Sequence, residues 1–166
     1  MLEHIDHVNL VVQDLAVMVE FYCQVLDMQE TKRVVIKGQW LDHVAGLERA
    51  EANVVYLSLP AGPRIELIEY VWPSGVRPEG LDKTNTMGLR HIAFRVSDID
   101  ATVEVLETKG VRLLSKITAV PSTQVAFKMG QRKRLVYFLD PEQNLLELCE
   151  FHFLFCNLKK DRKYEC

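Results

Sequence analysis

The stretch HVNLVVQDL, residues 7–15, returns with the same pattern as HIAFRVSDI, residues 91–99. Apolar residues alternate along both copies, and β-branched and aromatic residues are frequent, which predicts a strand. Each strand leads into an aspartate suited to cap a helix N-terminus, so a helix is expected to follow. The two opening histidines, His7 and His91, are 91 − 7 = 84 residues apart in a chain of 166 residues. The repeat therefore predicts two similar halves.

An acidic stretch closes each copy, RIELIE at residues 64–69 and LLELCE at residues 145–150. Glu66 and Glu147 occupy equivalent positions in these stretches, 147 − 66 = 81 residues apart. The glutamate three residues further along each stretch, Glu69 or Glu150, has the opposite parity in a strand, so it is expected to point to the other face of the sheet. A repeat that returns a histidine and a glutamate in equivalent places predicts a metal site with two imidazole and two carboxylate ligands.

The remaining pattern predicts the order β-α-β-β-β in each half, which is an α+β fold. In the first half a helix follows Asp14, and strands are expected at residues 34–36, at residues 54–57 and around Glu66. In the second half a helix is expected from Ile99 to a stop at Gly110, with strands at residues 111–117, at residues 135–139 and around Glu147.

The two halves are expected to form a single domain over residues 1–158. Within it we expect module one at residues 4–71, a linker at 72–87 that is rich in Pro, Gly, Asp, Asn and Thr, and module two at 88–151. A polar tail is expected at residues 159–166.

Two inserts, at residues 38–53 and 121–134, are long for loops and are expected to take part in recognition. The first contains Trp40, which is expected either to line a pocket or to cap the core. The second contains the basic run Arg132–Arg134, which is compatible with a solvated surface turn or with a lid that binds anions.

The bulk composition is that of an ordinary globular protein, with 48% hydrophobic and 26% charged residues. A net charge of −3 argues against a nucleic-acid surface, which needs a basic face. No apolar run is long enough for a membrane span, and no signal peptide is visible at the start of the sequence. The four cysteines form no CxxC pair, so we expect reduced thiols in a cytoplasmic protein, with Cys149 in the core.

These motifs together resemble the vicinal oxygen chelate superfamily, which includes glyoxalase I, methylmalonyl-CoA epimerase, extradiol ring-cleaving dioxygenases, and the bleomycin and fosfomycin resistance proteins. The resemblance covers about residues 4–151. It is carried by HVNL at 7–10, FY at 21–22, IEL at 65–67, GLRHIAF at 88–94, DP at 140–141 and LEL at 146–148. It implies two tandem βαβββ modules that form a curved mixed sheet, a barrel or cup, around a metal site. The site would be completed within one chain or across a homodimer.

Carried over residue by residue, the superfamily's metal ligands fall on His7, Glu66, His91 and Glu147. This set suits one divalent ion of Ni, Zn, Co, Fe or Mn, and it leaves two octahedral positions for adjacent substrate oxygens. The ion would act as a Lewis acid, and a carboxylate that leaves it would become a general base at the substrate carbon. Glu147 is the preferred base, and Glu66 is the second choice.

Four further residues are expected to bind a small-molecule substrate. Arg95 and Arg64 share strand parity with a ligand and suit a substrate carboxylate, although an outward, solvated position is equally compatible with Arg64. Trp40 belongs to the first insert. Tyr137 belongs to a Val-Tyr-x-x-Asp-Pro sequence that precedes Glu147.

The resemblance favours a glyoxalase I-type isomerisation, as in lactoylglutathione lyase, because glyoxalases have glutamate at the position of Glu66. Methylmalonyl-CoA epimerases usually have glutamine there, but residues 88–96 resemble theirs. Both reactions abstract a proton next to a carbonyl and stabilise the resulting enediolate or enolate on a metal. An extradiol-type dioxygenase is a further alternative, although residues 124–135 lack the histidine that its signature expects. The last alternative is a non-catalytic protein that binds a small molecule or confers resistance.

Overall fold

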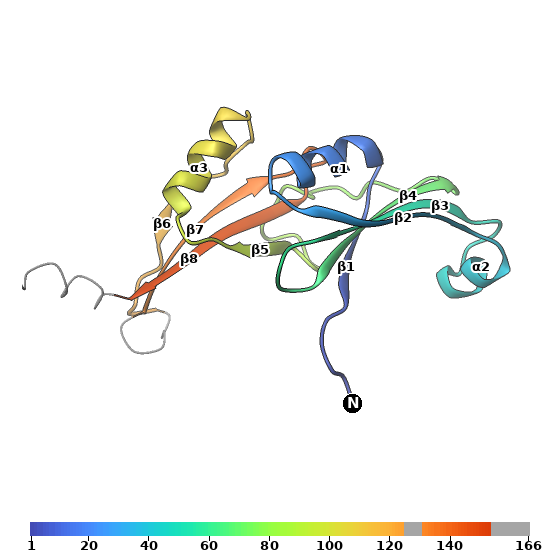
Figure 1. The fold of residues 1–166 in the computed structure, drawn as a ribbon, viewed down its shortest axis with the longest axis horizontal. Coiled ribbons are helices and arrows are strands. Elements are labelled where there is room, and N and C mark those ends of the chain that lie inside the picture. The colour runs from blue at the N-terminus through green and yellow to red at the C-terminus, as the bar shows by residue number, and fades with distance from the viewer. Residues whose placement is uncertain (125–130, 154–166) are drawn as a thin grey trace, which may run out of the picture. The chain divides into compact units, whose positions relative to one another are not determined.

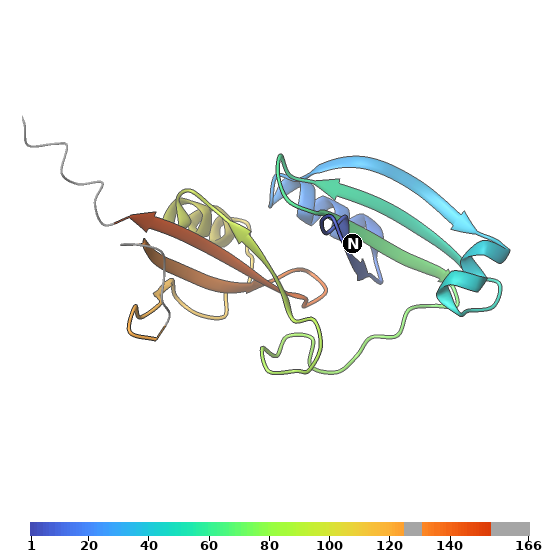
Figure 2. The same cartoon turned by 90° about the horizontal axis from the view of Figure 1, so that it is seen from below.

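The computed structural model describes residues 1–124 and 131–153, and the chain divides into two compact units. The first unit contains Met1–Leu81 together with Asp140–Gln143, and the second continues from Asp82 to Leu139 and from Asn144 onward. Each unit contains one four-stranded sheet with a helix on one of its faces (Figures 1 and 2). The expected tail at residues 159–166 lies outside the described residues.

The first sheet and its helices are here called module one. Its elements are β1 (His7–Val11), α1 (Leu15–Gln24), β2 (Gln29–Lys37), α2 (Gln39–Ala45), β3 (Glu51–Ser58) and β4 (Arg64–Trp72). The strand order is β1-β4-β3-β2, and β1 runs parallel to β4 while the other neighbours are antiparallel.

Module two repeats this arrangement. Its elements are β5 (His91–Arg95), α3 (Ile99–Thr108), β6 (Thr118–Ala119), β7 (Gln131–Leu139) and β8 (Leu145–Phe153). The strand order is β5-β8-β7-β6, again with the first strand parallel to the last. The α+β class and the two βαβββ modules are therefore confirmed. The described residues form two mixed sheets and no closed barrel.

Three expectations about the connecting segments are wrong. The strand expected at residues 111–117 is reduced to one isolated bridge, Leu113 to Phe138, because the chain bends at Leu114 and Ser115 before the short β6. The insert at 38–53 is not a plain loop, since it contains α2 and the start of β3. The basic run lies in β7 and is neither a surface turn nor a lid. Residues 125–130 of that insert lie outside the described residues.

Each module fixes its long helix to its sheet in the same way. Asp14 and Asp98 cap α1 and α3 by accepting hydrogen bonds from the amides of Val17 and Ala101. The helices then bury one apolar face, which in α1 consists of Leu15, Met18, Phe21 and Tyr22. Burial of this face, together with the apolar sheet residues beneath it, supplies most of the module's stability.

The turn between β7 and β8 belongs to the first unit and packs on α1. The hydroxyl of Tyr22 donates a buried hydrogen bond of 3.2 Å to Asp140. The carboxylate of Glu142 accepts hydrogen bonds from the amides of Gln13 and Asp14 at 2.8–2.9 Å. A negative charge beside the first turn of a helix is stabilised by the helix dipole. Burial, and then the negative charge of Asp140, raises the pKa of Tyr22 well above its ordinary value.

Removing the Tyr22 hydroxyl tests this contact. Tyr22→Phe is expected to lower the free energy of unfolding at neutral pH by about 1–2 kcal/mol, because Asp140 loses a buried donor. The wild type should lose stability above about pH 10, where the unfolded state ionises the phenol and the native state does not. Tyr22→Phe should lose less over the same range, as measured by urea unfolding at neutral and alkaline pH. The matched control is Tyr70→Phe, because the hydroxyl of Tyr70 makes no hydrogen bond within the described ranges. If both variants lost the same free energy of unfolding, the Tyr22–Asp140 hydrogen bond would not be stabilising.

Candidate metal centre

Parallel pairing places a histidine and a glutamate on the same face of each sheet. Asn9 of β1 is the register partner of Glu66, and Ala93 of β5 is the partner of Glu147. His7 lies two residues before Asn9, and His91 lies two residues before Ala93. Because side chains alternate along a strand, each histidine therefore lies on the same face as the glutamate. The Nε2 atom of His7 lies 3.3 Å from Oε2 of Glu66, and the equivalent atom of His91 lies 3.4 Å from Oε2 of Glu147.

In module one the side chains that hydrogen-bond to His7 and Glu66 include an acid and an amide, Asp6 and Asn9. Asp6 accepts a hydrogen bond of 2.8 Å from Nδ1 of His7, which leaves Nε2 of the ring facing Glu66. This hydrogen bond, followed by the one from Arg64, lowers the pKa of Asp6. Asn9 donates to Oε2 of Glu66 at 3.0 Å. A carboxylate that fixes the second nitrogen of an imidazole is a common arrangement behind metal-binding histidines.

Tyr56 completes this cluster. Its hydroxyl donates a short hydrogen bond to Oε1 of Glu66, and its ring packs edge-on against His7 at 5.9 Å between centroids. The hydrogen bond to the Glu66 carboxylate, together with burial, raises the pKa of Tyr56 to about 12. The phenol therefore stays protonated at neutral pH and remains a donor that orients Glu66.

Module two holds its pair in a related setting, in which a cation contacts the glutamate directly. Tyr137 packs against His91 at 5.3 Å between ring centroids, and it is the register partner of Glu147. Burial, and then the charge of Glu147, raises the pKa of Tyr137. Lys133 donates to Oε1 of Glu147 at 2.6 Å, so that Oε2 is the atom that faces His91.

The two pairs have the spacing and chemistry that a divalent ion requires. Two donor atoms bound to one ion at about 2.1 Å, with angles of about 90–110°, are about 3.0–3.4 Å apart. Both His–Glu distances agree with this, and they exceed the roughly 2.7–2.9 Å of a direct charged hydrogen bond. The histidine side chains are 37% and 36% exposed, so an ion can reach them. Within residues 1–124 and 131–153, however, no group of three or more His, Cys, Asp or Glu side chains is gathered at one point.

The other expected site residues have mixed positions. Arg64 pairs with Asp6 and stacks over the ring of Tyr56 at 4.8 Å, so it belongs to the His7 cluster rather than to open solvent. Arg95 stacks on Phe151 at 5.3 Å, on the face of the second sheet that carries Glu147. Trp40 lies on α2 and is 57% exposed, so it does not cap the core.

Sequence reasoning missed Asp6, Asn9 and Tyr56, and it placed Lys133 in a loop rather than in a strand beside Glu147. Tyr56 could have been found, because Tyr56 and Tyr137 are 137 − 56 = 81 residues apart, the same offset as Glu66 and Glu147. The other three have no equivalent in the second copy, and their roles depend on contacts that the repeat does not predict.

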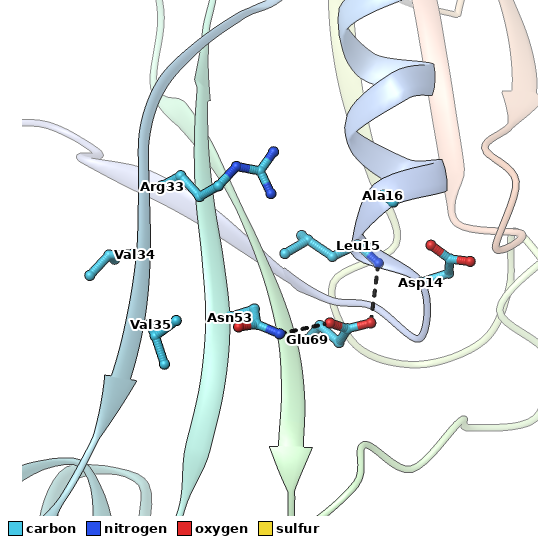
Figure 3. A pocket seen from close by; sticks show the side chains of 8 residues that line it. All are labelled: Asp14, Leu15, Ala16, Arg33, Val34, Val35, Asn53 and Glu69. Carbon is cyan, nitrogen blue, oxygen red and sulfur yellow. Dashed lines mark hydrogen bonds between the residues drawn. The ribbon is translucent and has the colours of Figure 1, made fainter.

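The second glutamate of each acidic strand points to the helix side, as its parity predicts. Glu69 accepts hydrogen bonds from the amide of Leu15 and from Asn53, and Glu150 accepts from the amide of Ile99 and from Arg134. Figure 3 shows Glu69 among the side chains that line a pocket on this side of module one, with its hydrogen bonds to Leu15 and Asn53. The volume of this pocket is about 520 Å³. The pocket contains none of the predicted ligands. Because Glu69 and Glu150 each accept a hydrogen bond from the first amide of a helix, we treat them as anchors for the helix N-termini.

Comparison with known proteins shows the family of this chain. The sequence model of the Glyoxalase/Bleomycin resistance protein/Dioxygenase superfamily matches residues 4–148. The chain belongs to this superfamily. It is 32% identical over 151 residues to the uncharacterized protein YaeR of Escherichia coli, covering 90% of this chain and 97% of that protein. It is 31% identical over 153 residues to the uncharacterized protein YwkD of Bacillus subtilis, covering 90% and 98%.

The structure of a glyoxalase family protein from Bacillus cereus also resembles this chain. It aligns with a TM-score of 0.76 and 26% identity, over 91% of this chain and 95% of that one. Membership in the glyoxalase/bleomycin resistance/dioxygenase superfamily defines the fold and the broad class, but the superfamily contains enzymes of several kinds and non-catalytic members. No helix in the described part of this member is long and apolar enough to cross a membrane.

Glu66 and Glu69 lie on opposite faces of β4 and offer a matched test of the candidate metal centre. Glu66→Gln is expected to weaken the binding of Co²⁺ or Ni²⁺ by at least about tenfold, because it replaces a charged ligand by a neutral amide. Glu69→Gln should leave metal affinity unchanged and lower the free energy of unfolding by about 1 kcal/mol, because it weakens the contact to the α1 N-terminus. Calorimetric titration and urea unfolding measure the two effects. If both substitutions changed metal affinity equally, Glu66 would not be a ligand.

Proposed function

We propose that this protein is a metal-dependent isomerase or lyase of the glyoxalase I type, and that His7, Glu66, His91 and Glu147 hold one divalent ion. The observation that supports this most directly is the repeated His–Glu–Tyr cluster, in which a buried carboxylate lies 3.3 or 3.4 Å from a half-exposed imidazole. Such an ion would supply Lewis-acid polarisation of a substrate carbonyl.

Burying two carboxylates is costly unless they have a function or full compensation. Glu66 and Glu147 are only 8% and 2% exposed. An ionised carboxylate removed from water costs several kcal/mol, which hydrogen bonds and opposite charge only partly offset. Tyr56 and Asn9 are neutral donors, so the negative charge of Glu66 in particular is available to balance a cation.

The proposed reaction is a proton transfer within one substrate. In a glyoxalase-type isomerisation, the carboxylate takes the proton from the carbon that carries a hydroxyl and a thioether, and it returns a proton to the neighbouring carbonyl carbon. The substrate is rearranged without net oxidation, so no external oxidant or reductant is needed. We assign the role of general base to Glu147 and take Glu66 as the alternative. The rings of Tyr56 and Tyr137 pack against His7 and His91 and so limit the rotation of the two imidazoles.

The reaction can be tested with the hemithioacetal of methylglyoxal and glutathione. The metal-loaded protein should convert it to S-lactoylglutathione, and in deuterium oxide NMR should show deuterium at the carbon that receives the proton. Glu147→Gln should slow this by about 10²–10⁴-fold, and His91→Ala should abolish the metal-dependent rate. Glu150→Gln, which lies on the opposite face of the same strand, should keep it. Full activity in both site variants would show that the residues are wrongly assigned.

Other outcomes separate the alternatives within the superfamily. Deuterium exchange into methylmalonyl-CoA, without conversion of the hemithioacetal, would indicate epimerase chemistry with the same proton abstraction. Oxygen consumption with a catechol would indicate ring cleavage. A protein that takes up no divalent ion would be a binding protein instead. We further propose that the protein acts as a homodimer in the cytoplasm; the two cysteines of the described residues, Cys23 and Cys149, form no disulfide.

A further inference from the structure

Two cations stand beside the His91–Glu147 pair on one face of the second sheet. Lys133 is the register partner of Phe151, and Arg95 is the partner of Cys149. Because side chains alternate along a strand, Glu147, Cys149 and Phe151 share a face. The charged groups of Lys133 and Arg95 lie 5.8 and 5.3 Å from the ring centre of Phe151, which brings both cations to the same aromatic ring.

Module one provides an internal control for this arrangement. The repeat offsets give the equivalent positions in module one. Lys133 corresponds to Ala52, because 133 − 81 = 52, and Arg95 corresponds to Val11, because 95 − 84 = 11. On the corresponding face of module one, Ala52 belongs to an apolar cluster with Val54 and Ile68, against which Tyr70 and other side chains pack. The same fold therefore forms with apolar residues at both positions, so the two cations are not required to build it.

The charges on this face do not balance within the described residues. Lys133 pairs with Glu147 at 2.6 Å, while no carboxylate in the described ranges lies within ion-pair distance of Arg95. If Glu147 also binds a divalent ion, the ion neutralises part of the negative charge of Glu147 that otherwise balances Lys133. The positive charges of Lys133 and Arg95 are then not balanced on this face.

We propose that Lys133 and Arg95 form an anion-binding subsite that receives a carboxylate or phosphate group of the substrate, beside the end of the metal centre formed by Glu147. Its role for a chelated substrate rests on the proposed function, but its affinity for anions does not. Arg95 supplies a planar donor fork and Lys133 a point charge, both of which suit oxyanions. The substrate class is thus an acidic metabolite with two adjacent oxygens and a separate anionic group.

The subsite can be tested without metal. In Glu147→Gln the carboxylate that competes for Lys133 is removed, so calorimetry should show inorganic phosphate or succinate binding. The comparison of the two probes shows which oxyanion class is preferred. Adding Lys133→Met or Arg95→Met to this variant should weaken binding at least about tenfold. Adding Lys116→Met, which removes an exposed lysine of module two, should change nothing. Equal affinity in all four proteins, or no binding in any of them, would overturn the subsite.

A second experiment uses the metal-loaded protein with an unchanged Glu147. 2-Oxoglutarate and 2-oxopentanoate can both chelate an ion through the 2-oxo acid, but only the former has a distal carboxylate. The wild type should bind 2-oxoglutarate at least about tenfold more tightly, and Arg95→Met should lose this preference while Arg95→Lys keeps part of it. No preference in the wild type would contradict the role in substrate binding. Failure to bind metal, with phosphate binding intact, would overturn the proposed function and leave the subsite standing.

Discussion

The parallel pairing of the first and last strands of each module is the constraint on which the rest of the site depends. It sets Asn9 opposite Glu66 and Ala93 opposite Glu147. A shift by one residue would turn every side chain of a strand to the other face. The register is held by apolar residues such as Leu67 and Leu148 on the helix side of the sheets, so the core of each module also positions its histidine and glutamate.

The same strands use opposite faces for two purposes. Glu69 and Glu150 secure helix N-termini on one side, while Glu66 and Glu147 face a histidine on the other. Four glutamates that look alike in the sequence thus separate into two structural and two candidate functional residues. The separation follows from strand parity alone, and for this reason the face of each residue could be predicted from the sequence.

The hydrogen-bond and ion-pair partners of the residues on each face could not be predicted from the sequence. Alternation indicates the side on which a residue lies, but not that Asn9 and Tyr56 donate to Glu66 or that Lys133 pairs with Glu147. The sequence places the basic run in the insert at residues 121–134, because the next apolar strand pattern begins only at residue 135. In β7 its charges are accommodated because alternate residues pair on opposite faces, Lys133 with Glu147 and Arg134 with Glu150 and Asp100.

The central claim is that the two halves of the repeat share one ion, and the stoichiometry of bound metal tests it most directly. Metal content after equilibration with Co²⁺ or Ni²⁺ should be one ion per chain in the wild type. His7→Ala and His91→Ala should each lose that ion, because a centre built from both copies fails when either is damaged. Two ions per chain, with each substitution removing only one of them, would contradict the account and make each module a separate site.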